Sequence, residues 1–402
     1  MPASRRDLLI ALNADLDLAR AAVCRLAQTL DRWHRRRRVE PARLGAELGV
    51  PAAAVERALA AARDAGRRAA AEQARAERAG ARIVTCHEAA YPPLLRHLPL
   101  PPAVLYVRGA LPDGPALAIV GSRRAGPYGL EAATLFARAL AAAGVAVVSG
   151  FARGVDAAAH RGALAAGGLT VAVLGCGVDV DYPRGHRRLG AALVAGGGAV
   201  VSELPCGAEP RAWNFPVRNR IIAALALGTL VVEAAARSGS LITARHALEL
   251  NRDVLAVPGR IFDERAMGPN TLIAAGAVPA RHPRDVLETL GLPVAAGGGE
   301  AAGGASAGGG GTASAGGATD GPKDGSSAGA QPAEGDGTLA GPPLPALQGR
   351  LLAALVPGDP RPAEAIAAAA GVTVDRALAG LLELELAGWA QRYPGPAWGR
   401  KA

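Results

Sequence analysis

The stretch ALAIVGSRRAGPYGLEAATLFARALAAAGVAVVSG (116–150) contains two short apolar runs, each ending in Gly, on either side of an Ala- and Leu-rich segment of helical length. Similar runs follow at TVAVLG (170–175), AVVSE (199–203), TLVVEAA (229–235) and DVLAVPG (253–259). Nearly continuous apolar strands that alternate with helices are typical of a parallel sheet covered on both faces. The sequence therefore predicts an α/β fold, an extended Rossmann-like doubly wound parallel sheet.

Three further regions flank this predicted sheet domain, which spans residues 89–293. Residues 1–88 are rich in Arg and are predicted to be helical. Residues 294–343 consist mainly of Gly, Ala and Ser, a composition typical of a flexible linker. We expect residues 344–402 to form a small winged-helix domain, with the wing in AQRYPGPAW (390–398).

Two segments have the pattern helix, Gly-Val turn, helix. They are PARLGAELGVPAAAVERAL (41–59) in the N-terminal region and RPAEAIAAAAGVTVDRALAGLLELELAGW (361–389) near the C-terminus. The pattern predicts helix-turn-helix units. A small helical bundle with a tight Gly-Val corner would show the same pattern, so both interpretations stay open.

The charge balance favours a polyanionic partner. The chain has 402 residues and 44 Lys and Arg against 35 Asp and Glu, a formal net charge of +9. Residues 1–88 and residues 89–293 each carry a net charge of +6. Positive charge favours nucleic acid because binding releases condensed counterions.

The composition also excludes several classes of protein. The four cysteines stand far apart without the spacing of a zinc site, which argues against a disulfide scaffold and against a bound metal. The longest uncharged apolar run, 221–232, is shorter than the roughly 20 residues that cross a bilayer. Asp7, Asp15 and Asp17 interrupt any signal peptide. We therefore expect a cytoplasmic protein without membrane insertion.

Polar and basic residues follow the first two predicted strands. Gly121-Ser122-Arg123-Arg124 opens a helix, and Gly150-Phe151-Ala152-Arg153 follows the next strand. The first loop lacks the Lys-Ser/Thr of a P-loop and the G-x-G-x-x-G of a dinucleotide site, so no nucleotide cofactor is predicted. It offers a hydroxyl, an Arg and the free N–H groups of a helix N-terminus, which suit a phosphate oxygen.

The densest segment is Trp213-Asn214-Phe215-Pro216-Val217-Arg218-Asn219-Arg220, in which aromatic rings precede an Arg-Asn-Arg at the start of an apolar helix. The next strand ends in Ala236-Arg237-Ser238-Gly239-Ser240, another helix N-terminus with hydroxyls and an Arg. Together these strand ends predict a basic groove that follows a phosphodiester backbone while rings hold bases. Nothing pairs His160 with a nucleophile, so a structural histidine is favoured over a general base, and Cys176 is expected to be a small buried side chain.

With these residues in view, the chain closely resembles the DNA-processing protein A family (DprA, also called Smf). The motifs that carry the resemblance are AIVGSRRAGPYG (118–129), VVSGFARGVDAAAH (147–160), FPVRNRIIAAL (215–225) and TLVVEAAARSGSLITA (229–244). The similarity covers about residues 91–290. Members often begin with a helix-hairpin-helix-like segment, of which residues 1–88 show no clear version.

The resemblance implies a protein without catalytic residues that binds single-stranded DNA. It implies that the protein protects incoming strands, helps a RecA-type recombinase to load during natural transformation and recombination, and forms a homodimer. A C-terminal winged helix after a linker is common in the family. The DNA-binding residues that the resemblance implies are Ser122, Arg123, Gly150, Arg153, Phe215, Arg218, Asn219, Arg220, Arg237, Ser238 and Ser240.

Two other functions compete with this prediction. A Rossmann-like enzyme acting on a nucleoside phosphate, of the ribohydrolase type, would use Glu203 or Glu233 at a strand end as its acid. The P-G-G-x-G-T loop of such enzymes is missing. A double-strand-binding transcription factor would instead use the helix-turn-helix segments, and residues 344–402 alone would then bind duplex DNA sequence-specifically.

Overall fold

The computed structural model describes residues 4–29, 39–293 and most of 346–400. The chain divides into two compact units, Met1–Gly304 and Ala305–Ala402. The flexible linker predicted at 294–343 lies outside the described residues. Within the described ranges, no helix is both long and apolar enough to cross a membrane.

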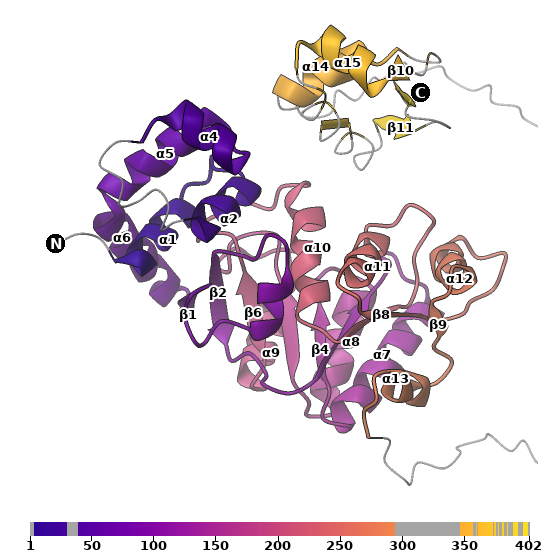
Figure 1. The fold of residues 1–402 in the computed structure, drawn as a ribbon. Coiled ribbons are helices and arrows are strands. Elements are labelled where there is room, and N and C mark those ends of the chain that lie inside the picture. The colour runs from indigo at the N-terminus through magenta and orange to yellow at the C-terminus, as the bar shows by residue number, and fades with distance from the viewer. Residues whose placement is uncertain are drawn as a thin grey trace, which may run out of the picture. The chain divides into compact units, whose positions relative to one another are not determined.

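The first unit is built on a nine-stranded sheet with the order β1-β2-β6-β5-β4-β3-β7-β8-β9 (Figure 1). From β6 to β9 all neighbours pair in parallel, whereas β2 pairs antiparallel with β6 and with β1. The predicted α/β fold with a mostly parallel sheet is confirmed. The strands are β1 (Ala81–Thr85), β2 (Val104–Gly109), β3 (Ala116–Val120), β4 (Ala146–Ser149), β5 (Thr170–Val173), β6 (Ala199–Ser202), β7 (Gly228–Val231), β8 (Asp253–Ala256) and β9 (Val278–Pro279).

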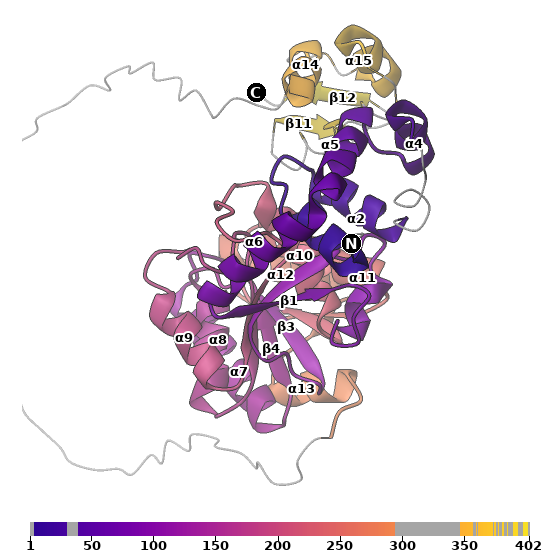
Figure 2. The same cartoon turned by 90° about the vertical axis from the view of Figure 1, so that its left-hand side faces the viewer.

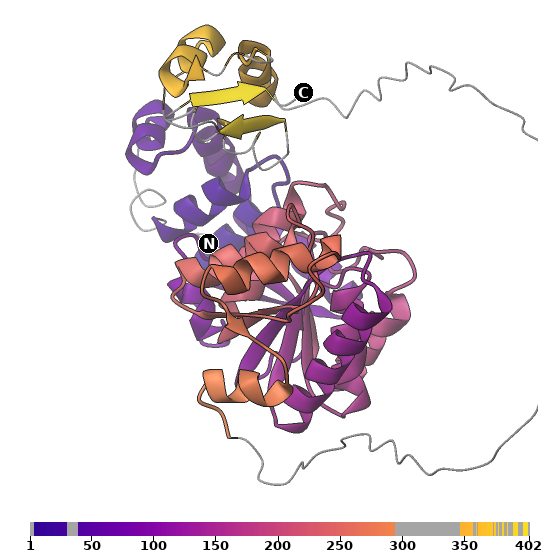
Figure 3. The same ribbon diagram turned by 90° about the vertical axis from the view of Figure 1, so that its right-hand side faces the viewer.

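Helices cover both faces of this sheet, as Figure 2 shows from one side and Figure 3 from the other. On one face lie α7 (Pro127–Ala142), α8 (Val155–Ala165), α9 (Arg187–Ala195) and α13 (Pro283–Thr289). The opposite face carries α10 (Asn214–Ala224) and α11 (Ser240–Glu249). A short helix η1 (Pro93–His97) precedes β2, and η2 (Glu264–Ala266) and α12 (Met267–Ala274) follow β8.

The alternation of side chains along each strand explains why the sheet has a core on each of its two faces. Leu117 and Ile119 of β3 join the core under α7, whereas Ala118 and Val120 join the core under α10. Successive side chains of a strand point to opposite faces, so a strand buried on both faces is apolar throughout. This is why the run 116–120 shows no polar alternation in the sequence.

The N-terminal region is helical as far as Arg78, and residues 81–85 differ from the helical prediction because they form β1 at the sheet edge. Its helices are α1 (Arg5–Asn13), α2 (Arg20–Gln28), α4 (Pro41–Leu48), α5 (Ala52–Arg63) and α6 (Ala65–Arg78). They gather at the β1 end of the sheet and share a core with β1 and β2 (Figure 1). The predicted turn between α4 and α5 is present, with Gly49 in the left-handed conformation that ends α4.

The second unit contains α14 (Ala346–Ala354), α15 (Ala363–Ala370) and a small antiparallel sheet, drawn in yellow in Figure 1. The strands β10 (Arg361–Pro362), β11 (Ala390–Arg392) and β12 (Ala397–Arg400) lie in the order β10-β12-β11. Leu351, Ile366 and Trp398 are buried together in its core. The strands β11 and β12 contain residues of the predicted wing.

Candidate nucleic-acid interface

The predicted site residues lie at the carboxyl-terminal edge of the sheet, where β5, β4, β3 and β7 are neighbours. Open α/β sheets bind their ligands at this edge. The residues follow β3 (Ser122, Arg123), β4 (Gly150, Arg153) and β7 (Arg237, Ser238, Ser240), or lie in the first two turns of α10 (Phe215, Arg218, Asn219, Arg220).

The loop after β3 is fixed by Glu233, which follows β7. The carbonyl of Glu233 accepts a hydrogen bond from the Ser122 N–H (2.6 Å), and its carboxylate accepts one from the Gly126 N–H (2.9 Å) at the start of α7. The helix N-terminus that the sequence predicted as a phosphate site is therefore already bonded to a carboxylate of this chain. Arg123 is exposed on the same loop and supplies a positive charge to the surface.

Phe215 is half-buried at the centre of the edge. A Cβ at Gly175 would lie 2.8 Å from Cδ1 of the Phe215 ring, so only glycine allows the ring to lie this close to the end of β5. The Tyr182 ring stands 5.3 Å from it. The guanidinium of Arg123 lies over the ring at 5.2 Å from its centre, and that of Arg218 lies at 5.8 Å. An aromatic face and an exposed cation are thus combined at one point.

Arg218 is buried and links the ends of β4 and β5. Its guanidinium donates hydrogen bonds to the carbonyls of Gly150 (2.6 Å) and Val173. Burial lowers the pKa of Arg218 to about 10, and the negative charge of Asp156 opposes this shift. Because its donors point at backbone carbonyls inside the protein, Arg218 positions the loops of the site.

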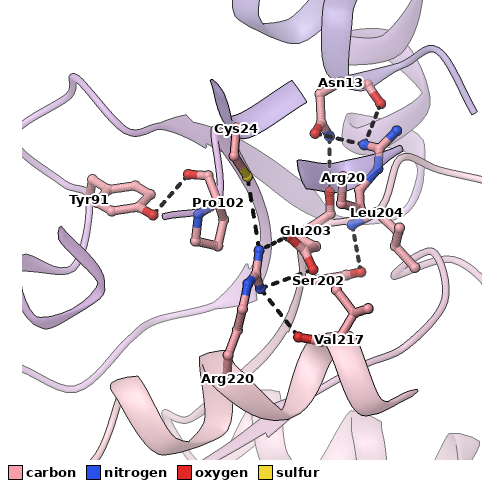
Figure 4. Close-up of polar contacts among 10 residues, drawn as sticks. All are labelled: Asn13, Arg20, Cys24, Tyr91, Pro102, Ser202, Glu203, Leu204, Val217 and Arg220. Atoms are coloured by element: carbon pink, nitrogen blue, oxygen red, sulfur yellow. Dashed lines mark hydrogen bonds and ion pairs between the residues drawn. The ribbon is translucent and has the colours of Figure 1, made fainter. Parts of the chain in front are cut away.

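Arg220 lies two residues further along α10 and points to a different part of the molecule (Figure 4). Its guanidinium forms a bidentate ion pair with Glu203, with oxygen–nitrogen distances of 2.7 and 3.1 Å. It also contacts the Cys24 sulfur at 4.0 Å. Burial opposes the charge of Arg220, but Glu203 and Cys24 outweigh that effect and raise its pKa. Arg220 is therefore engaged in an ion pair inside the protein.

The N-terminal helices complete the surroundings of this ion pair. The Asn13 side chain donates to the Glu203 carbonyl (3.0 Å), and Arg20 donates to the Asn13 side chain (2.9 Å) (Figure 4). Burial raises the pKa of the Cys24 thiol to about 11. Helices α1 and α2 thus contact the end of β6 through buried polar groups.

Asn219 supports the loop after β7. Its side-chain N–H donates to the Gly239 carbonyl (3.0 Å), at the turn that begins α11. The hydroxyls of Ser238 and Ser240 lie 2.8 Å apart within this turn, and Arg237 is exposed beside them. The two hydroxyls and the arginine therefore stand together as the sequence predicted.

The loop after β4 contributes one exposed charge, and the helix α8 that follows it contributes a buried imidazole. Arg153 is exposed. His160 is buried, and its Nδ1 lies 2.7 Å from the Thr170 hydroxyl, which donates to the Val147 carbonyl. Burial lowers the pKa of His160 to about 3, so the imidazole is neutral at physiological pH. This agrees with the structural role favoured from the sequence.

The two carboxylates that were candidates for the acid of a ribohydrolase are both bound within the protein. Glu203 pairs with Arg220, and Glu233 holds the loop after β3. Cys176 is buried as expected, and burial raises the pKa of its thiol to about 11. The described part of the chain contains no group of His, Cys, Asp and Glu side chains that could hold a metal ion.

Sequence reasoning missed one part of the edge. A cavity of about 780 Å³ opens between the loop after β3 and the loop after β8, and Ser122, Arg124, Arg260 and Phe262 line it. The sequence runs GSRR (121–124) and GRIF (259–262) give the residue types of this lining, but not that the two loops lie close together. The two loops come together because β3 pairs with β7 and β7 pairs with β8. This strand order cannot be read from the sequence of either loop.

Comparisons with known proteins agree with this architecture. The sequence model described as DNA recombination-mediator protein A matches residues 82–291, and the one described as the DprA winged helix domain matches residues 337–396. Protein Smf of Escherichia coli is 39% identical over 307 residues, which are 76% of this chain and 74% of that protein. DNA processing protein DprA of Streptococcus pneumoniae is 42% identical over 188 residues, 46% of this chain and 66% of that protein.

A solved structure gives the same result. The structure of DNA processing protein A from Streptococcus pneumoniae matches with a TM-score of 0.60 at 30% identity, and covers 72% of this chain and 98% of that chain. A structure that addresses the single-stranded DNA binding mode of DNA processing protein A from Helicobacter pylori covers 53% of this chain and 97% of that one, with a TM-score of 0.46 at 28% identity. The predicted winged helix and the predicted family are both confirmed. The chain belongs to the DNA recombination-mediator protein A family, the DprA or Smf proteins.

Proposed function

We propose that this recombination mediator binds single-stranded DNA along the carboxyl-terminal edge of its sheet. The observation that carries the proposal is the Phe215 ring with the exposed Arg123 guanidinium 5.2 Å from its centre. Aromatic rings stack on bases of every sequence, and arginines neutralise phosphates. A single strand offers both groups at once, because its bases are not confined to the interior of a duplex.

In this proposal the predicted residues fall into two groups with different roles. The groups that face solvent or line the edge are proposed to touch the strand: Ser122, Arg123, Arg153, Phe215, Arg237, Ser238 and Ser240. The remaining residues are proposed to position them, because each is engaged inside the protein: Gly150, Arg218, Asn219 and Arg220.

The test compares Arg123→Ala with Arg138→Ala. Both arginines are exposed, but Arg138 lies on α7 roughly 16 Å along the helix axis from the edge. Fluorescent oligo-dT and a matched duplex are titrated with the full-length protein across a range of salt. We expect tight, salt-sensitive binding that prefers the single strand. Arg123→Ala should weaken it and reduce the salt slope by about 0.7, the value for one phosphate contact on a single strand.

Arg138→Ala should leave both affinity and salt slope unchanged. If the two substitutions weaken binding equally, the strand is attracted only by the overall positive charge of the protein. That result would refute the edge as the binding site. Binding without any preference for the single strand would refute the proposed ligand. Release of free base from nucleoside monophosphates would overturn the view that the protein is not an enzyme.

The proposal extends to the partners that the resemblance implies. We propose that the bound strand is protected and passed to a RecA-type recombinase during natural transformation and recombination, by a homodimer in the cytoplasm. Membership in a family of recombination mediators supports this part. Light scattering measures the oligomeric state. Recombinase assembly on strands coated with single-strand-binding protein should be faster when this protein is present, and an unchanged rate would refute the loading role.

A further inference from the structure

The cavity between the loops after β3 and β8 lies beside the proposed strand-binding edge but contains none of its rings. We call it the β8 cavity. Its volume is about 780 Å³, and its lining includes Ser122, Arg124, Arg260, Phe262 and Arg265. The β8 cavity and the Phe215 site share the loop after β3, because Arg123 lies over Phe215 while Arg124 lines the cavity.

Phe262 is the most exposed large apolar residue of the described chain. Phe262 is 93% exposed, and the neighbouring Ile261 is 79% exposed. A ring in this position gains free energy when a flat apolar partner covers it, because apolar surface then leaves water. The bases of a nucleic acid are such partners, since every base has a π face.

The charges around the ring suit a polyanion. Three arginines and two acidic residues line the β8 cavity. One of those acids, Asp263, is neutralised by an ion pair with Arg265, whose Nε lies 3.1 Å from Oδ1. Arg124 and Arg260 are exposed and add positive charge at the mouth. The lining of the β8 cavity therefore combines an exposed ring with two exposed arginines.

We propose that the β8 cavity is a second base-binding subsite for the same single strand, in which Phe262 stacks on a base and Arg124 and Arg260 bind adjoining phosphates. This inference rests on the proposed function. The strand would pass from Phe215 over the loop after β3 to Phe262. The bound segment would therefore be longer than the Phe215 site alone requires.

The test uses Phe262→Ala with Ile261→Ala as its matched control, since both remove an exposed apolar side chain and only one removes a ring. Affinity of the full-length protein is measured by anisotropy for oligo-dT from about 4 to about 16 nucleotides, the range of site sizes for single-strand-binding folds. We expect Phe262→Ala to weaken binding of the longer oligomers by about 5- to 150-fold, the loss of one stacked base. Oligomers too short to span both rings should bind as before.

Further variants separate stacking from charge. Phe262→Trp should keep the wild-type affinity for the longer oligomers, because the tryptophan ring also stacks on a base. Arg260→Ala should reduce the salt slope by about 0.7 for those oligomers alone. Thermal melts should match the wild type for every variant, because these side chains lie on the surface.

The outcomes are distinct. If wild-type protein binds oligo-dT and Phe262→Ala binds all lengths equally well, the subsite is refuted while the proposed function stands. Equal losses in Phe262→Ala and Ile261→Ala would also refute it, as would a change in oligomeric state with unchanged affinity. If the wild type binds no single strand, both proposals fail.

Discussion

Replacing Arg220 by Ala leaves the carboxylate of Glu203 without its partner at a place that water hardly reaches. The two side chains are 13% and 5% exposed, and they meet through two oxygen–nitrogen contacts of 2.7 and 3.1 Å. Removing one partner of a buried ion pair typically costs about 3–5 kcal/mol, because the other charge stays buried without compensation. We expect a loss of this size in the free energy of unfolding of Arg220→Ala.

The matched control is Arg284→Ala, which breaks a pair with Glu288 whose Nε–Oε1 distance is 2.6 Å. Those side chains are 66% and 51% exposed, so water screens the pair and its loss should cost at most about 1 kcal/mol. Urea titrations of the full chain, followed by far-ultraviolet circular dichroism, measure both effects. The double variant Arg220→Met with Glu203→Gln, which leaves no buried charge, should recover much of the stability. Equal midpoints for Arg220→Ala and Arg284→Ala would refute the assignment of Arg220 to a structural ion pair.

Three further predictions concern the site and the core. Phe215→Ala should weaken oligo-dT binding by about 1–3 kcal/mol without changing the salt slope, because a ring neutralises no phosphate; anisotropy across salt measures both. A Cβ at Gly150 would lie 2.8 Å from Nη2 of Arg218, so Gly150→Ala should lower the melting temperature and the affinity together, whereas Gly114→Ala, with open space around its Cβ, should change neither. Burial lowers the pKa of His160 to about 3, so protonation favours the unfolded chain, and stability falls as the pH drops from about 6.5 toward 3 by at most about 1.4 kcal/mol per pH unit. Urea titrations at several pH values should therefore show a shallower loss in His160→Gln, and equal slopes would contradict the prediction.

Much of the sheet could be predicted because its signal is local. A continuous apolar run such as 116–120 predicts a strand that is buried on both faces of the sheet. The Gly and Ser residues that end these runs predict where the carboxyl edge lies. Exposed groups such as Arg123 and Arg237 could be placed at that edge for the same reason, since each lies in the loop that follows a strand.

The roles of Arg218 and Arg220 could not be predicted, because their partners are distant in the sequence. Arg220 contacts Cys24, 196 residues away, through helices whose packing no local pattern reveals. Glu233 reaches Gly126, 107 residues earlier, and occupies a helix N-terminus that the sequence alone presents as open. An Arg in a basic motif looks the same whether it meets a phosphate or a buried carboxylate, and only the fold decides between them.

The two arginines of α10 that bond inside the protein together explain how Phe215 is held. Arg218 links the helix by hydrogen bonds to the ends of β4 and β5, and Arg220 links it by an ion pair to Glu203 after β6. Glu203 is in turn bonded through its carbonyl to Asn13 of α1, so the N-terminal helices share the support of the helix that carries the ring. A perturbation of this ion pair acts on Phe215 through the position of α10 rather than through charge. Its effect on strand binding should therefore accompany a loss of stability and leave the salt slope unchanged, which distinguishes it from the loss of a phosphate contact.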